Sequence, residues 1–227
     1  MGVQERGWLG RLVGTMIRRT VRQRFHSVYW RPPHTPLVAP VIFACSHHNW
    51  HDGYLMFHAV DRLGIRCLDW IAEYHAFPLF RFVGGMPFTP GNLAERTATI
   101  RESIRRMQTA GESLVLFADG VLRPPGQPWQ IGEALDLVVR RVPDVMVVPV
   151  GITTHMGIHE RPLAGVWMGE PMTVGPNTRQ RTKQMVDILL AEGHRALSRD
   201  SVESAMLAKG TFDVNERWDM RRRFGKF

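Results

Sequence analysis

The chain has 227 residues, 44% of them hydrophobic and 9% aromatic, and a formal net charge of +8. This length supports one substantial core rather than two domains, and the composition excludes a disordered chain, a collagen and a repeat array. Residues 1–30 carry a charge of +5 and residues 217–227 carry +4, so the body is near neutral; basic ends of this kind favour an anionic lipid surface over nucleic acid.

The N-terminal segment has the pattern of an amphipathic helix. Apolar residues recur mostly at steps of one, three or four from Trp8 to Trp30, and arginines such as Arg11, Arg18 and Arg22 fill the opposite face. The helix would lie either on a membrane surface or against the protein's own core. The sequence shows no cleavable signal peptide, and its longest apolar stretch falls well short of the ~20 residues of a spanning helix. We therefore expect a peripheral protein on the cytoplasmic face of the cell membrane.

Strand-like and helical segments alternate after the prolines at 32, 33 and 36. The predicted strands cover residues 38–44, 65–71, 86–89, 113–117 and 145–152, and another begins at 166–168. The predicted helices cover 50–60, 77–83, 93–110, 131–141, 178–197 and 202–208. This order predicts an α/β fold with a mostly parallel central sheet flanked by helices. We expect three segments: the basic helix in 1–35, the α/β domain in 36–200, and a C-terminal helix with a basic tail in 201–227.

The two cysteines, Cys45 and Cys67, each fall in an apolar run that is typical of a strand. Their positions favour two buried thiols in a reducing compartment over a disulfide or a metal pair.

Two polar loops follow predicted strands, at residues 46–52 and 118–128. Binding sites in open sheets of this kind gather at the carboxyl ends of strands. The first loop holds the densest cluster of ionisable groups in the chain. Asp52 could accept a proton from one ring nitrogen of His47 and leave the other nitrogen free to act as a base. The chain has no G-x-S-x-G motif, so such a base would act directly on a substrate hydroxyl.

Other interpretations of these loops stay open. Asp52 could only cap a helix together with Asn49. His48 and His51, three residues apart, could instead bind zinc and with Asp52 form a metal-dependent hydrolase site. In the second loop, Asp119-Gly120 is either an ordinary turn or a close approach of the backbone to a ligand. A further residue of that loop, Arg123, could bind a phosphate or carboxylate.

Taken together, five elements over residues 38–171 resemble the lysophospholipid and glycerol-phosphate acyltransferase family (PlsC-like). The family's N-H-x-x-x-x-D motif is matched by residues 46–52, with serine in place of asparagine. The other four resemble F-P-E-G-T-R, P-F-K-x-G, a strand ending in V-P-V, and a G-E-P turn; they lie at Phe117–Leu122, Pro128–Gly132, Val148-Pro149-Val150 and Gly169-Glu170-Pro171.

The resemblance implies an O-acyltransferase with His47 as general base and Asp52 as its partner. It implies an acyl thioester of CoA or a carrier protein as co-substrate, a lipid acceptor, no cofactor and no metal; we expect no nucleic-acid partner, and the sequence leaves the oligomeric state open. A non-catalytic lipid-binding protein of the same fold is the alternative. The implied substrate-binding residues are Phe88, Asp119, Gly120, Arg123 and Pro149. For the oxyanion, we expect a backbone N–H near Gly120 or Trp50.

Two departures from the family pattern bear on the acceptor. The arginine of the family's G-x-x-F-x-x-R motif is replaced by Gly91, and the arginine of F-P-E-G-T-R is replaced by Leu122. The resemblance associates these arginines with the acceptor's phosphate. We therefore expect an acceptor without a phosphomonoester, such as a lysolipid with another head group or a sugar hydroxyl on a glycolipid.

Overall fold

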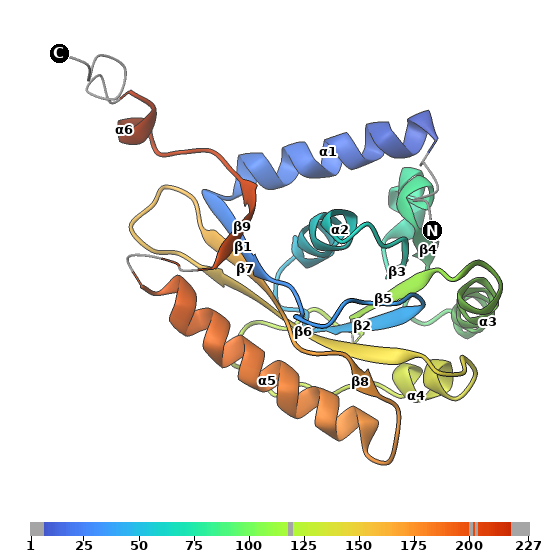
Figure 1. Ribbon diagram of the computed structural model, residues 1–227. Helices are drawn as coiled ribbons and strands as arrows, with labels where there is room; N and C mark the ends of the chain where they lie inside the picture. Colours follow the sequence, from blue (N-terminus) through green and yellow to red (C-terminus); the bar gives the residue numbers. More distant parts are fainter. Residues whose placement is uncertain (1–6, 118–119, 200–201, 203, 219–227) are drawn as a thin grey trace.

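The structure is a computed structural model that describes residues 7–117, 120–199, 202 and 204–218. In this part of the chain, a nine-stranded mixed sheet lies between two layers of helices (Figure 1). The strands are β1 (Ser27–Arg31), β2 (Val41–Cys45), β3 (Cys67–Ile71), β4 (Gly85–Pro87), β5 (Ser113–Phe117), β6 (Met146–His155), β7 (Leu163–Met168), β8 (Met172–Thr173) and β9 (Ala205–Lys209). The helices are α1 (Trp8–Arg24), α2 (Asp52–Arg62), α3 (Leu93–Ala110), α4 (Ala134–Val139), α5 (Thr178–Leu197) and α6 (Val214–Arg217), with 3-10 turns η1 (Tyr74–Ala76) and η2 (Pro78–Val83).

The strand order is β4-β3-β5-β2-β6-β7-β1-β9, and β8 pairs with β6. The centre is parallel, because β2 runs parallel to both β5 and β6, and β3 runs parallel to β5 and β4. Strand β7 turns back antiparallel to β6, β1 lies parallel to β7, and β9 closes the edge antiparallel to β1. The expected α/β architecture is present, with a mixed sheet.

The buried face of each helix explains the two layers. Alternate residues of β2 point to opposite sides of the sheet. On one side, Phe43 and Cys45 pack in a core with Leu55 and Met56 of α2 and with Val21 of α1. On the other side, β2 contributes to a second core that contains residues of α3, α4 and α5: Ile42, Ala44, Met107, Leu135, Val138 and Val186. Both faces of the central strand are therefore covered, which accounts for its wholly apolar sequence.

Two predicted helical stretches are wrong. The first helix ends at Arg24 rather than at residue 30, and residues 27–31 form β1, paired with β7. The predicted helix over 202–208 is absent, because residues 205–209 form β9 against β1. In both cases the pairing partner is far away in the sequence, so tertiary pairing overrides the local helical pattern.

Three elements match their predicted bounds: α3, β5 and α5. Helix α3 begins after Asn92, whose side chain accepts a hydrogen bond from the Glu95 N–H at 3.1 Å, and it ends at Gly111 with φ of +63°. Helix α2 begins two residues later than predicted, at Asp52, and this leaves residues 46–51 in the loop that follows β2. Among the described helices, none combines the length and apolarity that crossing a membrane requires.

Candidate functional site

The loop after β2 is anchored to the neighbouring strand β6 by its first residue. Ser46 is buried, and its backbone N–H donates to the Val150 carbonyl at 3.0 Å. Its Oγ accepts a hydrogen bond from the Ile152 N–H at 2.9 Å. Serine at this position, where the family motif has asparagine, therefore fixes the start of the loop on the central strands.

His47 and Asp52 form the expected pair. Nδ1 of His47 lies 3.2 Å from Oδ2 of Asp52, so a proton on Nδ1 is donated to the carboxylate and Nε2 is left as the proton acceptor. The Asp52 side chain is 1% exposed and the His47 side chain 22% exposed. The geometry thus holds one ring nitrogen on a buried carboxylate and leaves part of the ring accessible.

Asp52 also holds the backbone of the loop. Its Oδ2 accepts hydrogen bonds from the N–H groups of His48 at 2.7 Å and Asn49 at 2.8 Å. The Asn49 side chain in turn accepts from the His51 N–H at 2.9 Å. One carboxylate oxygen therefore holds the loop backbone and contacts His47 at the same time, whereas α2 itself begins at Asp52 with His51 as its N-cap and without a side-chain cap.

The second polar loop meets the first through backbone groups. The Arg123 N–H donates to the His47 carbonyl at 3.0 Å, and Nδ1 of His48 donates to the Arg123 carbonyl at 3.0 Å. The ring of Phe117, at the end of β5, lies 4.4 Å from the His47 ring between centroids. Parallel strands β2 and β5 end side by side, which explains why loops so distant in the sequence converge at His47.

A narrow apolar pocket of about 210 Å³ opens beside His47. It runs between α2, β3 and the 3-10 turns, and Ile17 of α1 closes one side. Aromatic and aliphatic side chains dominate its wall, among them Trp50, Tyr54, Phe57, Trp70, Phe80 and Phe117. A lining of this kind accommodates an alkyl chain better than a polar head group.

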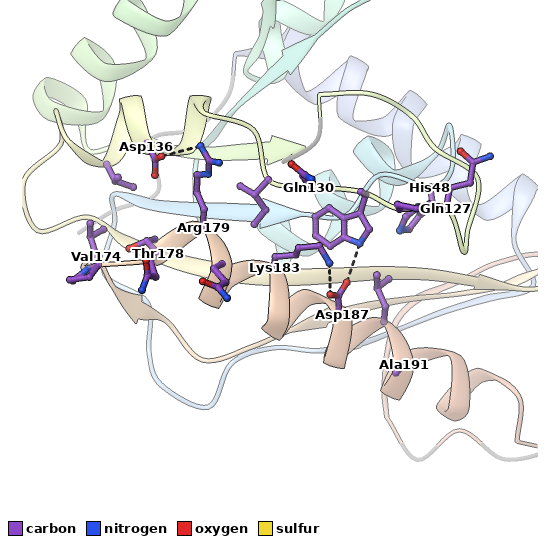
Figure 2. A pocket seen from close by; sticks show the side chains of 18 of the residues that line it. His48, Gln127, Gln130, Asp136, Val174, Thr178, Arg179, Lys183, Asp187 and Ala191 are labelled. Atoms are coloured by element: carbon purple, nitrogen blue, oxygen red, sulfur yellow. Dashed lines mark hydrogen bonds and ion pairs between the residues drawn. The ribbon is translucent and has the colours of Figure 1, made fainter.

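A wider groove of about 1250 Å³ lies on the other side of the loop, with His48 at its edge. Figure 2 shows that residues 125–131 and α5 form its walls. Two of its cationic side chains are held by acids: Arg179 contacts Asp136 at 3.2 Å, and Lys183 contacts Asp187 at 2.6 Å. The loop thus lies between a small apolar pocket and a wider groove that also carries charged side chains.

One carboxyl group sits in the wall of the apolar pocket. Asp69 lies in the middle of β3, and burial raises its pKa to about 7, against the opposing effect of a hydrogen bond from the Trp70 backbone. Its Oδ1 is inaccessible to solvent and has no hydrogen-bond partner among the described residues. Asp69 was not predicted as a site residue, although an acid inside an apolar strand is a signal for one.

The structure places the expected substrate-binding residues unevenly. The ring of Phe88 stacks on Trp70, a wall residue of the apolar pocket, at 4.6 Å. Pro149 is buried in β6, and its carbonyl accepts from Gly169 N–H at 2.9 Å. Gly120 has φ of +65°, and its N–H donates a hydrogen bond to the Phe117 carbonyl at 2.9 Å. This N–H, one of those near which an oxyanion donor was expected, is therefore already in use. Asp119 lies outside the described residues.

The described residues do not bring His48, His51 and Asp52 together as a metal site. Nδ1 of His51 donates to the Asn49 side chain at 3.1 Å, while Nδ1 of His48 is held by Arg123. The cysteines form no disulfide in the described part of the chain; Cys45 is buried and Cys67 half-buried.

Four potential metal ligands converge elsewhere: His26, His159, Asp213 and Glu216. The two imidazole rings stack nearly parallel, at 3.7 Å and 11°. Each ring meets its own carboxylate at 2.8 Å, His26 with Glu216 and His159 with Asp213. An imidazole binds a metal in its own plane, so two parallel rings at this spacing fit ion pairs better than one shared ion.

Comparison with known proteins bears on the fold. No family model matches this sequence, and no curated protein is significantly similar to it. Among solved structures, the 1-acyl-sn-glycerophosphate (LPA) acyltransferase PlsC from Thermotoga maritima superposes with a TM-score of 0.53 and 17% sequence identity. The match covers 84% of this chain and 78% of that one. The chain therefore has a PlsC-like fold.

Proposed function

We propose that this protein is an O-acyltransferase that moves a fatty acyl group from a thioester to a hydroxyl of a lipid acceptor. The observation that carries the proposal is the His47–Asp52 pair, with its 3.2 Å contact, at the opening of a narrow apolar pocket. A PlsC-like fold and the five sequence elements support the same reaction. The thioester is one of CoA or a carrier protein.

The proposed reaction uses His47 as a general base and then as a general acid. Nε2 of His47 takes the proton of the acceptor hydroxyl while the oxygen attacks the thioester carbonyl. The C–S bond then breaks, and the leaving thiolate takes the proton from His47. Base catalysis of this kind contributes about 10²–10⁴-fold, so positioning and oxyanion stabilisation supply the rest.

We assign the acyl chain to the apolar pocket. Its wall includes His47, so a chain inside it presents the thioester carbon to the base. The wider groove on the other side of the loop, which carries charged side chains, is left for the polar parts of the two substrates. Among the described residues, three cationic side chains line this groove, and two of them, Arg179 and Lys183, are held by Asp136 and Asp187, while Arg140 is the third. The support for an acceptor without a phosphomonoester is therefore the replacement of the two motif arginines by Gly91 and Leu122.

We also propose that the protein works at the membrane surface. Helix α1 buries Val13, Ile17 and Val21 but leaves Trp8, Leu12 and Met16 more than half exposed, four residues apart along one outer row. The adjoining 3-10 segment exposes Phe77 and Leu79 to a similar degree, and Phe77 also lines the apolar pocket. An exposed apolar rim next to the pocket would let an acyl chain enter from the bilayer.

The test is a transfer assay with full-length protein, tetradecanoyl-CoA, and a panel of lysolipids and glycolipids on vesicles. We expect transfer to neutral acceptors and weak transfer to lysophosphatidate. His47→Ala should lower the rate by at least about 10²-fold without lowering the melting temperature. The matched control is His58→Ala, on the far part of α2. Wild-type rates in His47→Ala would contradict the mechanism, and preferred use of lysophosphatidate would contradict the acceptor class.

A further inference from the structure

A second set of exposed apolar side chains lies outside both the apolar pocket and the wider groove. In the loop between β6 and β7, Met156 is 65% exposed and Ile158 is 95% exposed. Helix α6 and the residue after it add Val214 and Trp218, which are 45% and 66% exposed. The Trp218 N–H donates to the Val214 carbonyl at 3.0 Å, so these two side chains lie on one face of the helical turn. We call these four residues the C-terminal surface.

Hydrogen bonds hold the two segments of the C-terminal surface side by side. The Glu160 N–H donates to the Asp213 side chain at 2.9 Å, and the Val214 N–H donates to the Glu160 side chain at 2.8 Å. The His159 ring also meets Asp213, at 2.8 Å. The backbone that carries Ile158 is therefore fixed next to the start of α6, and the exposed apolar side chains of both segments are presented together.

The C-terminal surface adjoins the C-terminal end of α1. The Arg161 side chain, at the end of the loop, donates to the Gln23 carbonyl at 2.9 Å, and the Thr211 hydroxyl donates to the Arg22 carbonyl at 2.7 Å. Figure 1 shows α6 beyond this end of α1, whereas the exposed outer row of the helix starts at Trp8, at its other end. The 17 residues of α1 extend over about 25 Å. Exposed apolar side chains are thus present towards both ends of one helix.

The charges around the C-terminal surface favour an anionic partner. The described acidic side chains of the loop and around α6 are each paired with a basic side chain: Glu160 with Arg161, Asp213 with His159, and Glu216 with His26. Arg217 is exposed in α6, and residues 217–227 carry a net charge of +4 in the sequence. Arg19 and Arg22 are exposed on the second half of α1, between the outer row and the C-terminal surface. An anionic surface would therefore meet cations along this whole side.

A fluid bilayer fits these features better than a folded partner does, because it receives protruding apolar side chains without a matching hollow. Tryptophan beside basic residues is typical of the head-group level of anionic membranes. We propose that the C-terminal surface is a second membrane contact, which places Ile158 and Trp218 in the head-group region of an anionic bilayer. The inference rests on the membrane location in the proposed function. Contacts towards both ends of α1 keep this helix along the bilayer, and Ile17 of the same helix lines the apolar pocket.

The experiment measures cosedimentation of the full chain with phosphatidylglycerol vesicles. We expect the double variant Ile158→Gln/Trp218→Gln to bind about tenfold or more weakly than wild type, because two apolar side chains no longer enter the bilayer. Its unfolding free energy should stay near that of wild type, since both side chains are exposed. The matched control is Leu93→Gln/Leu137→Gln, which removes two exposed apolar side chains of α3 and α4 on the other side of the sheet (Figure 1). This control should bind vesicles as wild type does.

A second double variant, Leu12→Gln/Met16→Gln in the outer row of α1, separates this inference from the proposed membrane location. Weak binding by that variant, together with wild-type binding by Ile158→Gln/Trp218→Gln, overturns the second contact and leaves the membrane location in place. Wild-type protein that binds no vesicles overturns both. Equally tight binding of wild type to phosphatidylcholine vesicles overturns the anionic bilayer as the partner. A molar mass in sedimentation that falls in Ile158→Gln/Trp218→Gln, with vesicle binding unchanged, assigns the surface to a second copy of the chain and also overturns the inference.

Discussion

Asp52 holds the backbone of the loop after β2 and also contacts the ring of His47. One of its oxygens accepts from the backbone N–H groups of His48 and Asn49 and also meets Nδ1 of His47. The other oxygen, Oδ1, is buried and has no partner among the described residues. Replacements at this position can therefore separate the folding of the loop from the orientation of the base.

We expect Asp52→Asn to lose about 10²–10⁴-fold in kcat/KM and to keep its melting temperature within a few degrees. The amide oxygen can still accept from the two N–H groups, but the charge that stabilises a protonated His47 is gone. Asp52→Ala should be equally inactive and less stable by about 1–3 kcal/mol, since the N–H groups lose their acceptor. Kinetics and denaturant unfolding of both variants check this. Wild-type turnover by Asp52→Asn would show that Asp52 only caps the loop.

The pair His47 and Asp52 could be predicted from the sequence because the two residues are only five positions apart and belong to the same loop. The place of Asp69 in the wall of the apolar pocket could not be predicted. It depends on Gly53 and Phe117, which belong to other elements and meet Asp69 only in the folded protein. The expected substrate residue Pro149 shows the converse, since its strand was predicted correctly while its side chain turned out to be buried.

At the scale of elements, α1 carries two apolar rows rather than one. Val13 and Ile17 pack with Phe57 of α2, whereas Trp8, Leu12 and Met16 remain exposed. The two expectations for this helix, contact with the core and contact with a membrane, thus apply to different rows. The first is seen in the structure, and the second stays a prediction.

The double variant Leu12→Gln/Met16→Gln tests the outer row. We expect at least a tenfold loss of binding to phosphatidylglycerol vesicles, because each exposed side chain contributes up to about 1.5–3 kcal/mol when buried in an apolar phase. Its unfolding free energy should stay near that of wild type. Ile17→Ala, in the inner row, is the matched control: it should lose about 2–5 kcal/mol of stability. Vesicle cosedimentation and urea unfolding separate the two effects, and unchanged vesicle binding in the double variant would refute membrane contact by this row.

The elements that were predicted within their bounds have local signals, such as the capping Asn92 and the left-handed Gly111 around α3. The two that failed, β1 and β9, are short strands that pair with each other at one end of the sheet. Their hydrogen-bond partners are set by the path of the whole chain. Local periodicity carries no information on such pairing, which is why both stretches looked helical.

At the scale of the whole molecule, the sheet joins the parts that matter for the proposed reaction. Central strands β2 and β5 end beside each other and bring His47 and Phe117 into contact, while β3 places Asp69 behind them. At the far end, β1 and β9 join segments near the two ends of the chain, and His26 and His159 hold the C-terminal segment through Glu216 and Asp213. The carboxyl group of Asp69, in the wall of the apolar pocket, has a consequence for global stability.

Because burial raises the folded-state pKa of Asp69 from 3.8 to about 7, the folded protein binds more protons at this site than the unfolded chain between these two values. Its contribution to stability is therefore complete below pH 4, falls as the pH rises towards 7, and then levels off. Asp69→Asn has no such proton to lose. The stability of the variant relative to wild type should increase between pH 4 and pH 8.

The expected increase is up to about 4 kcal/mol, and the opening of the pocket to solvent reduces it. Urea unfolding of both proteins at pH 4.5 and pH 8 measures the difference. Other groups around Asp69, namely Asp52, His47, Glu73, Cys45 and Cys67, are common to both proteins and largely cancel in the comparison. A difference between variant and wild type that does not change with pH would mean that the pKa of Asp69 is the same in the folded and unfolded states, and it would contradict the effect of burial on this group.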